Sequence, residues 1–144
     1  MIQRTDIYTA VNLLLKSKYP SYKTYGHEVT EGYKKPSFFV DLIPRGISNE
    51  SINFKKYAYT IMITYFQETV DEIDNLKKVD EIQELFGYKL RVKESLFNIT
   101  DFSYDFVGEF TNVLQIRVDF DYTEYNERIR GPVANEININ LEKR

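Results

Sequence analysis

The sequence has no cysteine, no tryptophan, a single histidine and no long apolar run. Without cysteine there is no disulfide and no thiolate metal site, which fits a reducing compartment. A helix that crosses a membrane needs about 20 apolar residues, and no stretch approaches that length. The first residues also lack the layout of a signal peptide. We therefore expect a soluble, cytoplasmic protein.

The signatures of common enzyme classes are missing as well. The chain has no glycine-rich phosphate loop, no H-E-x-x-H zinc motif and no G-x-S-x-G nucleophile motif. His27 lies in a loop-like stretch without ligand-spaced cysteines, so a surface histidine is the simpler interpretation. A deep pocket converging on His27, Asp119 or Asp121 would instead favour a small-molecule-binding or enzymatic domain. We expect no catalytic residue, no cofactor and no metal.

A large basic cluster is also missing, because the net charge is −3 and Lys34-Lys35 and Lys55-Lys56 are isolated pairs. We therefore expect no strong attraction to nucleic acid or to an anionic membrane. Acidic residues do cluster, at Asp71, Glu72 and Asp74 and again at Asp119 and Asp121. We interpret the first group as the start of a helix rather than a metal site. The second is interpreted as a solvated strand face rather than a catalytic pair.

Aromatic residues are abundant, with 12 tyrosines and 10 phenylalanines, and they mark the strands. Phe54–Gln67, FKKYAYTIMITYFQ, is apolar on both of its period-two faces, which is typical of a central strand. Phe110–Tyr122 alternates most regularly, with an apolar face and a polar face that carries Asp119 and Asp121. Shorter strands are predicted at Ser37–Ile43 and Tyr88–Lys93. The region from Leu96 to Phe106 is predicted to form a bulged strand or two short ones.

Two stretches have helical periodicity with start and stop signals. Thr5–Lys18 begins with Thr5 as a candidate cap and carries apolar residues at helical spacing. Asp71–Phe86 follows a capping box that starts at Thr69, and Gly87 is placed to end it. Its apolar residues recur every three positions, so we expect this helix to contact more than one surface. Together these elements predict an α+β fold, a mostly antiparallel sheet with two helices packed on it.

The remaining segments are expected at the surface. Pro44–Asn53 is rich in Gly, Ser and Asn and is predicted to be an exposed, mobile loop at the tip of a long hairpin. We assign residues 1–126 to a single domain and residues 127–144 to a C-terminal arm. After Gly131-Pro132 the arm alternates Ile137, Ile139 and Leu141 with polar residues. Disorder and addition of a strand to a neighbouring sheet are both open interpretations of this pattern.

The opening, DIYTAVNLLLKSKYPSYKTYGHEVTEGYKKPSFFVDLIP, resembles the phage tail terminator family of contractile-tailed phages, prophages and tail-like particles. The resemblance lies in the leading helix, in the passage KYPSYKTYGHEVTEGYKKPSFFVDLIP and in the strand Tyr57–Phe66. It implies an α+β subunit of a hexameric ring that sits on the last ring of the tail tube protein and halts polymerisation. The ring offers a surface to the head or its connector, with the sheath as a further partner. No catalytic residue is implied.

A head–tail connector or tail-completion protein of similar fold is the alternative within the same class. In either case the protein is expected in the host cytoplasm during assembly and then in the tail of the particle, with DNA only as a passing cargo. A DNA channel should have an acidic or neutral lining, because phosphate contacts would stall passage. The candidates for this lining are Asp119, Asp121, Asp71, Glu72 and Asp74. The candidates for contacts between subunits are Ile47, Ile52, Ile137, Ile139 and Leu141.

Overall fold

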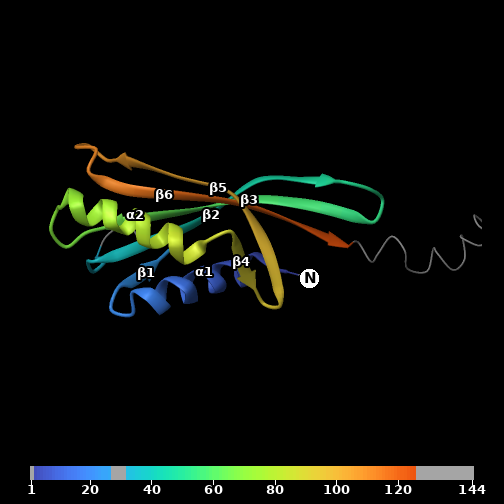
Figure 1. Ribbon diagram of the computed structural model, residues 1–144, viewed down its shortest axis with the longest axis horizontal. Coiled ribbons are helices and arrows are strands. Elements are labelled where there is room, and N and C mark those ends of the chain that lie inside the picture. Colours follow the sequence, from blue (N-terminus) through green and yellow to red (C-terminus); the bar gives the residue numbers. More distant parts are fainter. Residues whose placement is uncertain (1, 27–31, 126–144) are drawn as a thin grey trace, which may run out of the picture.

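The computed structural model describes residues 2–26 and 32–125. Within these ranges the chain forms two helices and six strands (Figure 1), in the order α1 (Arg4–Lys18), β1 (Lys23–Tyr25), β2 (Ser37–Asn49), β3 (Phe54–Phe66), α2 (Glu72–Phe86), β4 (Lys89–Val92), β5 (Ser95–Val107) and β6 (Val113–Tyr125). The strands build one sheet in the order β1-β2-β3-β6-β5-β4, and only β1 and β2 are parallel neighbours. The predicted α+β fold, with a mostly antiparallel sheet and two helices, is confirmed.

β3 lies in the middle of this sheet, between β2 and β6, as the prediction of a central strand required. Its odd-numbered residues from Tyr59 to Tyr65 are buried in one core with alternate residues of β6, from Leu114 to Phe120. The buried residues of both helices belong to the same core. The even-numbered residues of β3 point to the other side of the sheet. The sheet therefore has a helix-covered face and an open face.

The helices begin at different residues from those that the sequence predicts. At α1 the cap is Gln3, whose N–H donates to the carboxylate of Asp6 at 2.8 Å, so Thr5 lies inside the helix. At α2 the cap is Asp71, whose carboxylate accepts the N–H of Ile73 at 3.0 Å. The predicted capping box at Thr69 is wrong. The side chain of Gln67 bonds the backbone of Asp71 in both directions, at 2.7 and 3.0 Å, and this contact delays the helix start.

The C-terminal end of α2 matches its prediction, but its buried face differs from the face that its apolar residues predict. Gly87 ends the helix with a φ of 60°, as predicted. Ile73 and Leu76, the first members of the predicted apolar stripe, are 62% and 40% exposed. The buried face instead follows ordinary helical spacing and includes two polar residues; it consists of Asn75, Lys78, Val79, Ile82 and Phe86.

The predicted loop at Pro44–Asn53 is mostly strand. A bulge at Arg45, between the pairs Pro44–Tyr59 and Gly46–Ala58, lets β2 continue to Asn49 as the partner of β3. Only the short turn that follows is irregular, and the predicted long hairpin is confirmed. The sequence predicts that the strand ends before Pro44, whereas the bulge at Arg45 lets it continue past this proline.

The last strand is shifted relative to its prediction. β6 starts at Val113 and not at Phe110, because Gly108 and Thr111 adopt positive φ angles of 94° and 48° in a turn closed by a 3.1 Å bond from the Thr111 N–H to the Gly108 carbonyl. Phe110, predicted in the core, is 75% exposed. β5 is one strand with a bulge between Ile99 and Asp101, one of the two predicted forms.

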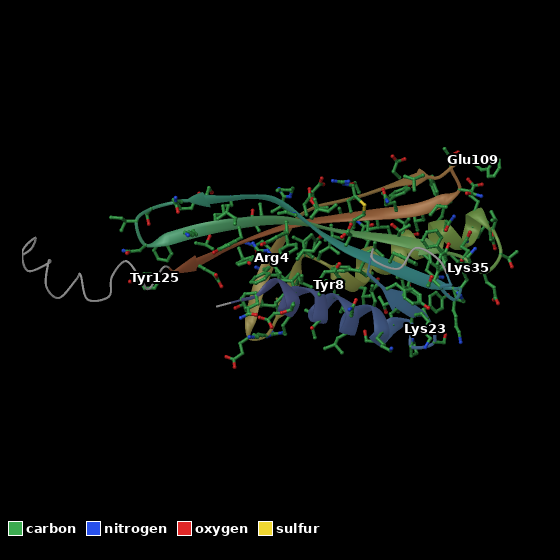
Figure 2. All side chains as sticks on the ribbon, turned by 180° about the vertical axis from the view of Figure 1, so that it is seen from behind. Arg4, Tyr8, Lys23, Lys35, Glu109 and Tyr125 are labelled. Atoms are coloured by element: carbon green, nitrogen blue, oxygen red, sulfur yellow. The ribbon has the colours of Figure 1, made fainter. Side chains whose placement is uncertain are left out.

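One end of the sheet extends beyond the helices, as Figure 1 shows. This sheet extension consists of residues 46–49 of β2, 54–58 of β3 and 121–125 of β6, paired in register from one strand to the next. In Figure 2, Tyr125 at its tip lies at the opposite end of the molecule from Lys35 and Glu109. The N-terminal segment is tied to the extension, because the Ile2 N–H donates to the Glu124 carboxylate at 2.6 Å.

Candidate assembly surface

The open face of the sheet brings together polar residues that lie far apart in the sequence. The register sets Thr60 beside Asp119 and Ala58 beside Asp121, on the β3–β6 ladder. The Thr60 hydroxyl donates to the Asp119 carboxylate at 2.5 Å. Thr60 is fully buried although no described helix packs on this face. Asp119 and Asp121 are therefore half-buried within a polar network and are not freely solvated side chains.

Arg45 crosses the open face from the β2 bulge. Its guanidinium donates to the backbone carbonyls of Tyr59, at 3.1 Å, and Phe120, at 3.0 Å. Its Nε atom lies 3.8 Å from the Asp119 carboxylate. A bulge re-aims the side chain of the extra residue, and here it sends an arginine across three strands. Arg45 thus fixes the base of the sheet extension and compensates the charge of Asp119.

Asp121 has a basic neighbour as well, because the Lys56 ammonium lies 3.7 Å from its carboxylate. Both pairs are partly exposed, so each contributes little to stability. The two pairs instead affect the surface charge, because a basic side chain compensates the negative charge of each of these two predicted channel residues. Around Asp119 and Asp121 this surface is therefore closer to neutral than to acidic, while the register sets Asp41, Asp101 and Asp105 on the same face.

The other predicted channel residues, at the start of α2, lie on the helix-covered side. Asp71 caps the helix, Glu72 is exposed, and Asp74 contacts the core. The Asp74 carboxylate accepts bonds from the Tyr65 hydroxyl at 2.7 Å, the Gln67 amide at 3.0 Å and the Lys78 ammonium at 2.9 Å. Burial disfavours its ionisation, but these three donors outweigh that effect and lower the pKa of Asp74 to about 2.

Lys78, the partner of Asp74, is a buried cation inside a tyrosine cage. Its side chain is 7% exposed, and its ammonium lies 5.4, 5.5 and 5.1 Å from the ring centres of Tyr19, Tyr22 and Tyr65. Burial alone would lower the pKa of Lys78, but its contacts with Asp74 and Tyr22 raise it instead. This cluster joins α1, the sheet and α2, and we assign it to the stability of the fold.

Sequence reasoning missed both Arg45 and Lys78. For Arg45 the available signal was a Pro-Arg-Gly triplet inside a strand pattern, which is typical of a bulge. For Lys78 the signal was its place on the same helical face as Val79 and Ile82, where a charged residue needs a partner. The i, i+4 pair of Asp74 and Lys78 was visible in the sequence, but its burial was not.

Apolar residues are exposed at the tip of the sheet extension. Ile47 and Ile52, both predicted to contact other subunits, are 52% and 70% exposed. Phe54 and Tyr125 lie beside each other on the adjoining strands, with ring centres 5.3 Å apart, and each is 42% exposed. Ile137, Ile139, Leu141 and His27 lie outside the described residues. That Ile47 and Ile52 contact another subunit stays a prediction.

Asp121 lines a shallow notch with Ser95, Leu96, Phe97, Asn98, Tyr122 and Thr123. Within residues 2–26 and 32–125, no three acidic or histidine side chains are grouped so that they could hold a metal ion. The described helices include none that is long and apolar enough to span a membrane.

These features define an α+β protein whose sheet has one helix-covered face, one open face and a protruding end. The sequence profile of the phage tail terminator proteins matches residues 6–132, and because this covers most of the chain, the protein belongs to the phage tail terminator family. It is therefore a structural component of a phage tail.

Comparison with curated proteins gives no sequence match. One solved structure superimposes with a TM-score of 0.52 at 9% identity, over 88% of this chain and 97% of the other. At that identity the likeness supports the fold alone.

Proposed function

We propose that this chain assembles as a ring, most simply a hexamer, that caps the last ring of the tail tube and ends tube polymerisation. The observation that carries this proposal is the family match over residues 6–132. The exposed end of the ring offers a joining surface to the head or its connector, and its rim can contact the sheath. Assembly takes place in the host cytoplasm, and the finished ring stays in the tail of the particle.

The shape of the subunit supports a ring. A closed ring of identical subunits uses heterologous contacts, in which one surface patch binds a different patch on the next copy. The chain is elongated, and the sheet extension projects from one end of it (Figure 1), with Ile47 and Phe54 on its strands and Ile52 in the turn between them. Exposed apolar residues at such a protrusion are suited to burial against a neighbour. We propose that residues 1–126 form the ring body and that residues 127–144 serve as an arm between subunits.

We further propose that the open face lines the channel. The support is the local charge balance around Asp119 and Asp121, because Arg45 and Lys56 lie beside them. A neutral lining with its polar groups already hydrogen-bonded does not bind DNA phosphates. Unlike a strongly acidic wall, it also does not gather counterions, so DNA can pass without being held. Asp71, Glu72 and Asp74 lie on the opposite side of the sheet and cannot share this surface; their predicted place in a channel is untested.

The solution mass and symmetry of the purified protein test the proposed ring. Native mass spectrometry should give a species six times the 17.1 kDa of one chain, and electron microscopy should show rings with a central opening. A protein that stays monomeric in the presence of the tail tube protein would contradict the proposal. Labelled protein should then be found where the tube meets the head; binding at the portal without the tube would favour a connector.

A further inference from the structure

The outer edge of β5 has a strand partner over only its first residues. β4 pairs with Ser95–Asn98, and the Ile99 N–H donates to the Tyr88 carbonyl at 2.9 Å. The rest of this edge, Thr100–Val107, has no strand on its outer side among residues 2–26 and 32–125. An edge strand presents a row of N–H and C=O groups with which another strand can pair. This stretch, the β5 edge, can therefore accept a further strand.

Three aromatic residues lie along the helix-covered side of the β5 edge. Phe102, Tyr104 and Phe106 are in register with buried core residues of β6, so they point to the same side as that core. Tyr104 is nevertheless 47% exposed, and the two phenylalanines are only partly buried. The rings of Tyr104 and Phe106 pack edge to face, with their centres 6.1 Å apart. A further strand with apolar residues on this side would cover these rings.

The other side of the β5 edge is polar and acidic. Asp101, Ser103 and Asp105 are in register with residues of β6 that point to the open face. The Asp105 carboxylate also accepts the Phe106 N–H at 2.8 Å, so it shields one backbone donor. Two copies of β5 would bring these carboxylates together, and like charges on facing strands are destabilising. The β5 edge is therefore suited to a strand that is apolar on one side and neutral on the other.

The C-terminal arm contains such a strand pattern. Ile137, Ile139 and Leu141 have the same spacing as the three aromatic residues of the β5 edge, and Asn138 and Asn140 lie between them. We propose that in the ring the arm of one subunit pairs with the β5 edge of the next. This inference rests on the proposed ring and names the surface that receives the arm. Strand addition of this kind satisfies the backbone groups and gains specificity from alternate side chains.

The two ends of the subunit bring these partners together between neighbours. β6 ends at Tyr125, whereas β5 ends at Val107, close in sequence to Glu109 at the opposite end of the molecule (Figure 2). In a ring whose subunits follow one another end to end, the arm of one subunit reaches the next at Val107. Because β6 is antiparallel to β5, an arm that continues in the direction of β6 is antiparallel to the β5 that it meets.

Antiparallel pairing has one register that matches every apolar residue. With Ile139 opposite Tyr104, the three apolar residues of the arm face the three rings, and both asparagines lie on the acidic side. The only like-charge pair in this register is Glu142 opposite Asp101, and two basic residues follow Glu142 in the sequence. The contact covers the exposed rings and pairs the backbone groups of the β5 edge in one step.

Distance prevents the same antiparallel contact within one chain. Phe106 is in register with Leu114, and Tyr125 lies 11 residues further along β6, about 37 Å away at about 3.4 Å per residue. The 11 residues between Tyr125 and Ile137 span at most about 40 Å when fully extended. A chain that returned to Phe106 would also need two turns, for which no length remains.

Engineered cysteines test this pairing without background, because the natural chain has none. Chains that carry Tyr104→Cys are mixed with chains that carry Ile139→Cys, assembled into rings and mildly oxidised. A disulfide between the two kinds of chain, identified from the mass of the linked peptides, forms only if the arm crosses to a neighbour. Ile137→Cys and Leu141→Cys, each mixed with Tyr104→Cys, cover the registers that are shifted by two residues.

The matched control mixes Tyr104→Cys with Asn138→Cys, because successive residues of a strand point to opposite sides. At least one of the three same-side mixtures should give severalfold more of the mixed disulfide than the control. Equal yields in all four mixtures, or none in rings whose mass is confirmed, would overturn the pairing and leave the ring itself standing. Failure of the natural protein to form rings would instead contradict the proposed function, and this contact with it.

Hydrogen exchange supplies an independent readout of the backbone bonds. Amides of residues 100–107 that exchange freely in the monomer should slow at least tenfold in the ring. The double variant Ile137→Asn/Ile139→Asn, which removes most of the apolar side of the arm, should return them to fast exchange. Equal protection of these amides in the monomer and in the ring would overturn the proposal, because the β5 edge would then gain no partner on assembly.

Discussion

Arg45 and Asp119 meet across three strands of the open face, with 3.8 Å between the Arg45 Nε atom and the Asp119 carboxylate. The contact exists because a single bulged residue in β2 sends its side chain over β3 to β6. The same guanidinium bonds the carbonyls of Tyr59 and Phe120. Arg45 therefore ties the sheet extension to the sheet and balances a charge on the surface that we propose as the channel lining.

Replacing Arg45 with alanine should weaken the base of the extension. The variant loses two charged hydrogen bonds and a half-exposed ion pair, and we expect unfolding to become easier by about 1–2 kcal/mol. Denaturant unfolding measures the loss. Arg91→Ala, which removes an exposed arginine on β4, is the control and should change stability by less than about 0.5 kcal/mol. Equal effects of the two changes would mean that Arg45 holds nothing in place.

Replacing Lys78 with alanine should be more costly. The change leaves Asp74 without its cationic partner and empties the cage of Tyr19, Tyr22 and Tyr65. Losing one partner of a fully buried pair typically costs about 3–5 kcal/mol, and because Asp74 is 32% exposed we expect roughly 2–3 kcal/mol here. The neighbouring Lys77→Ala is the control, since Lys77 is exposed. Similar thermal stabilities of the two variants would contradict the description of Lys78 as a buried, caged cation.

Acid should remove a contribution that Asp74 makes to stability. Its pKa is lowered from 3.8 to about 2 in the folded chain, so its contribution is complete above pH 4 and is lost as the pH falls towards 2. After allowance for partial exposure we expect about 1–2 kcal/mol. Unfolding titrations of the natural chain and of Asp74→Asn should differ most above pH 4 and converge near pH 2. A constant difference across this range would contradict the assignment.

The channel proposal predicts a functional effect without a loss of assembly. Asp119→Lys and Asp121→Lys together would replace two negative charges by two positive ones beside Arg45 and Lys56, and such a lining should hold DNA phosphates. We expect rings of normal mass but a fall in particle infectivity or DNA ejection. Asp80→Lys with Glu84→Lys makes the same charge change on the exposed surface of α2 and is the control. Unchanged infectivity with intact rings would remove Asp119 and Asp121 from the channel.

The sequence was sufficient for the elements whose pattern comes from burial alone. The alternation around Ile61, Ile63, Ile116 and Val118 predicted the central strands, because the same residues fill the core. The apolar pattern did not predict the structure where a single local contact determines how far a strand or helix extends. The bulge that carries β2 past Pro44, and the side chain of Gln67 that delays α2, depend on partners that a pattern of apolar residues does not reveal.

The candidate surface was predictable only in part, for the same reason. The alternation of β6 placed Asp119 and Asp121 on one polar face, which the structure confirms. Their neighbours Arg45 and Lys56 come from other strands, so the charge balance of the face requires the register of the sheet. The acidic start of α2 looked equivalent in the sequence, but the fold places it on the opposite side.

The length of tail tubes tests the central claim most directly. The cognate tail tube protein is allowed to polymerise with and without this protein, and electron microscopy gives the distribution of tube lengths and the structure of the tube ends. A terminator should leave tubes that stop growing, each with a ring at one end, even when free tube protein remains. Tubes that elongate equally in its presence, with bare ends, would contradict the proposed function.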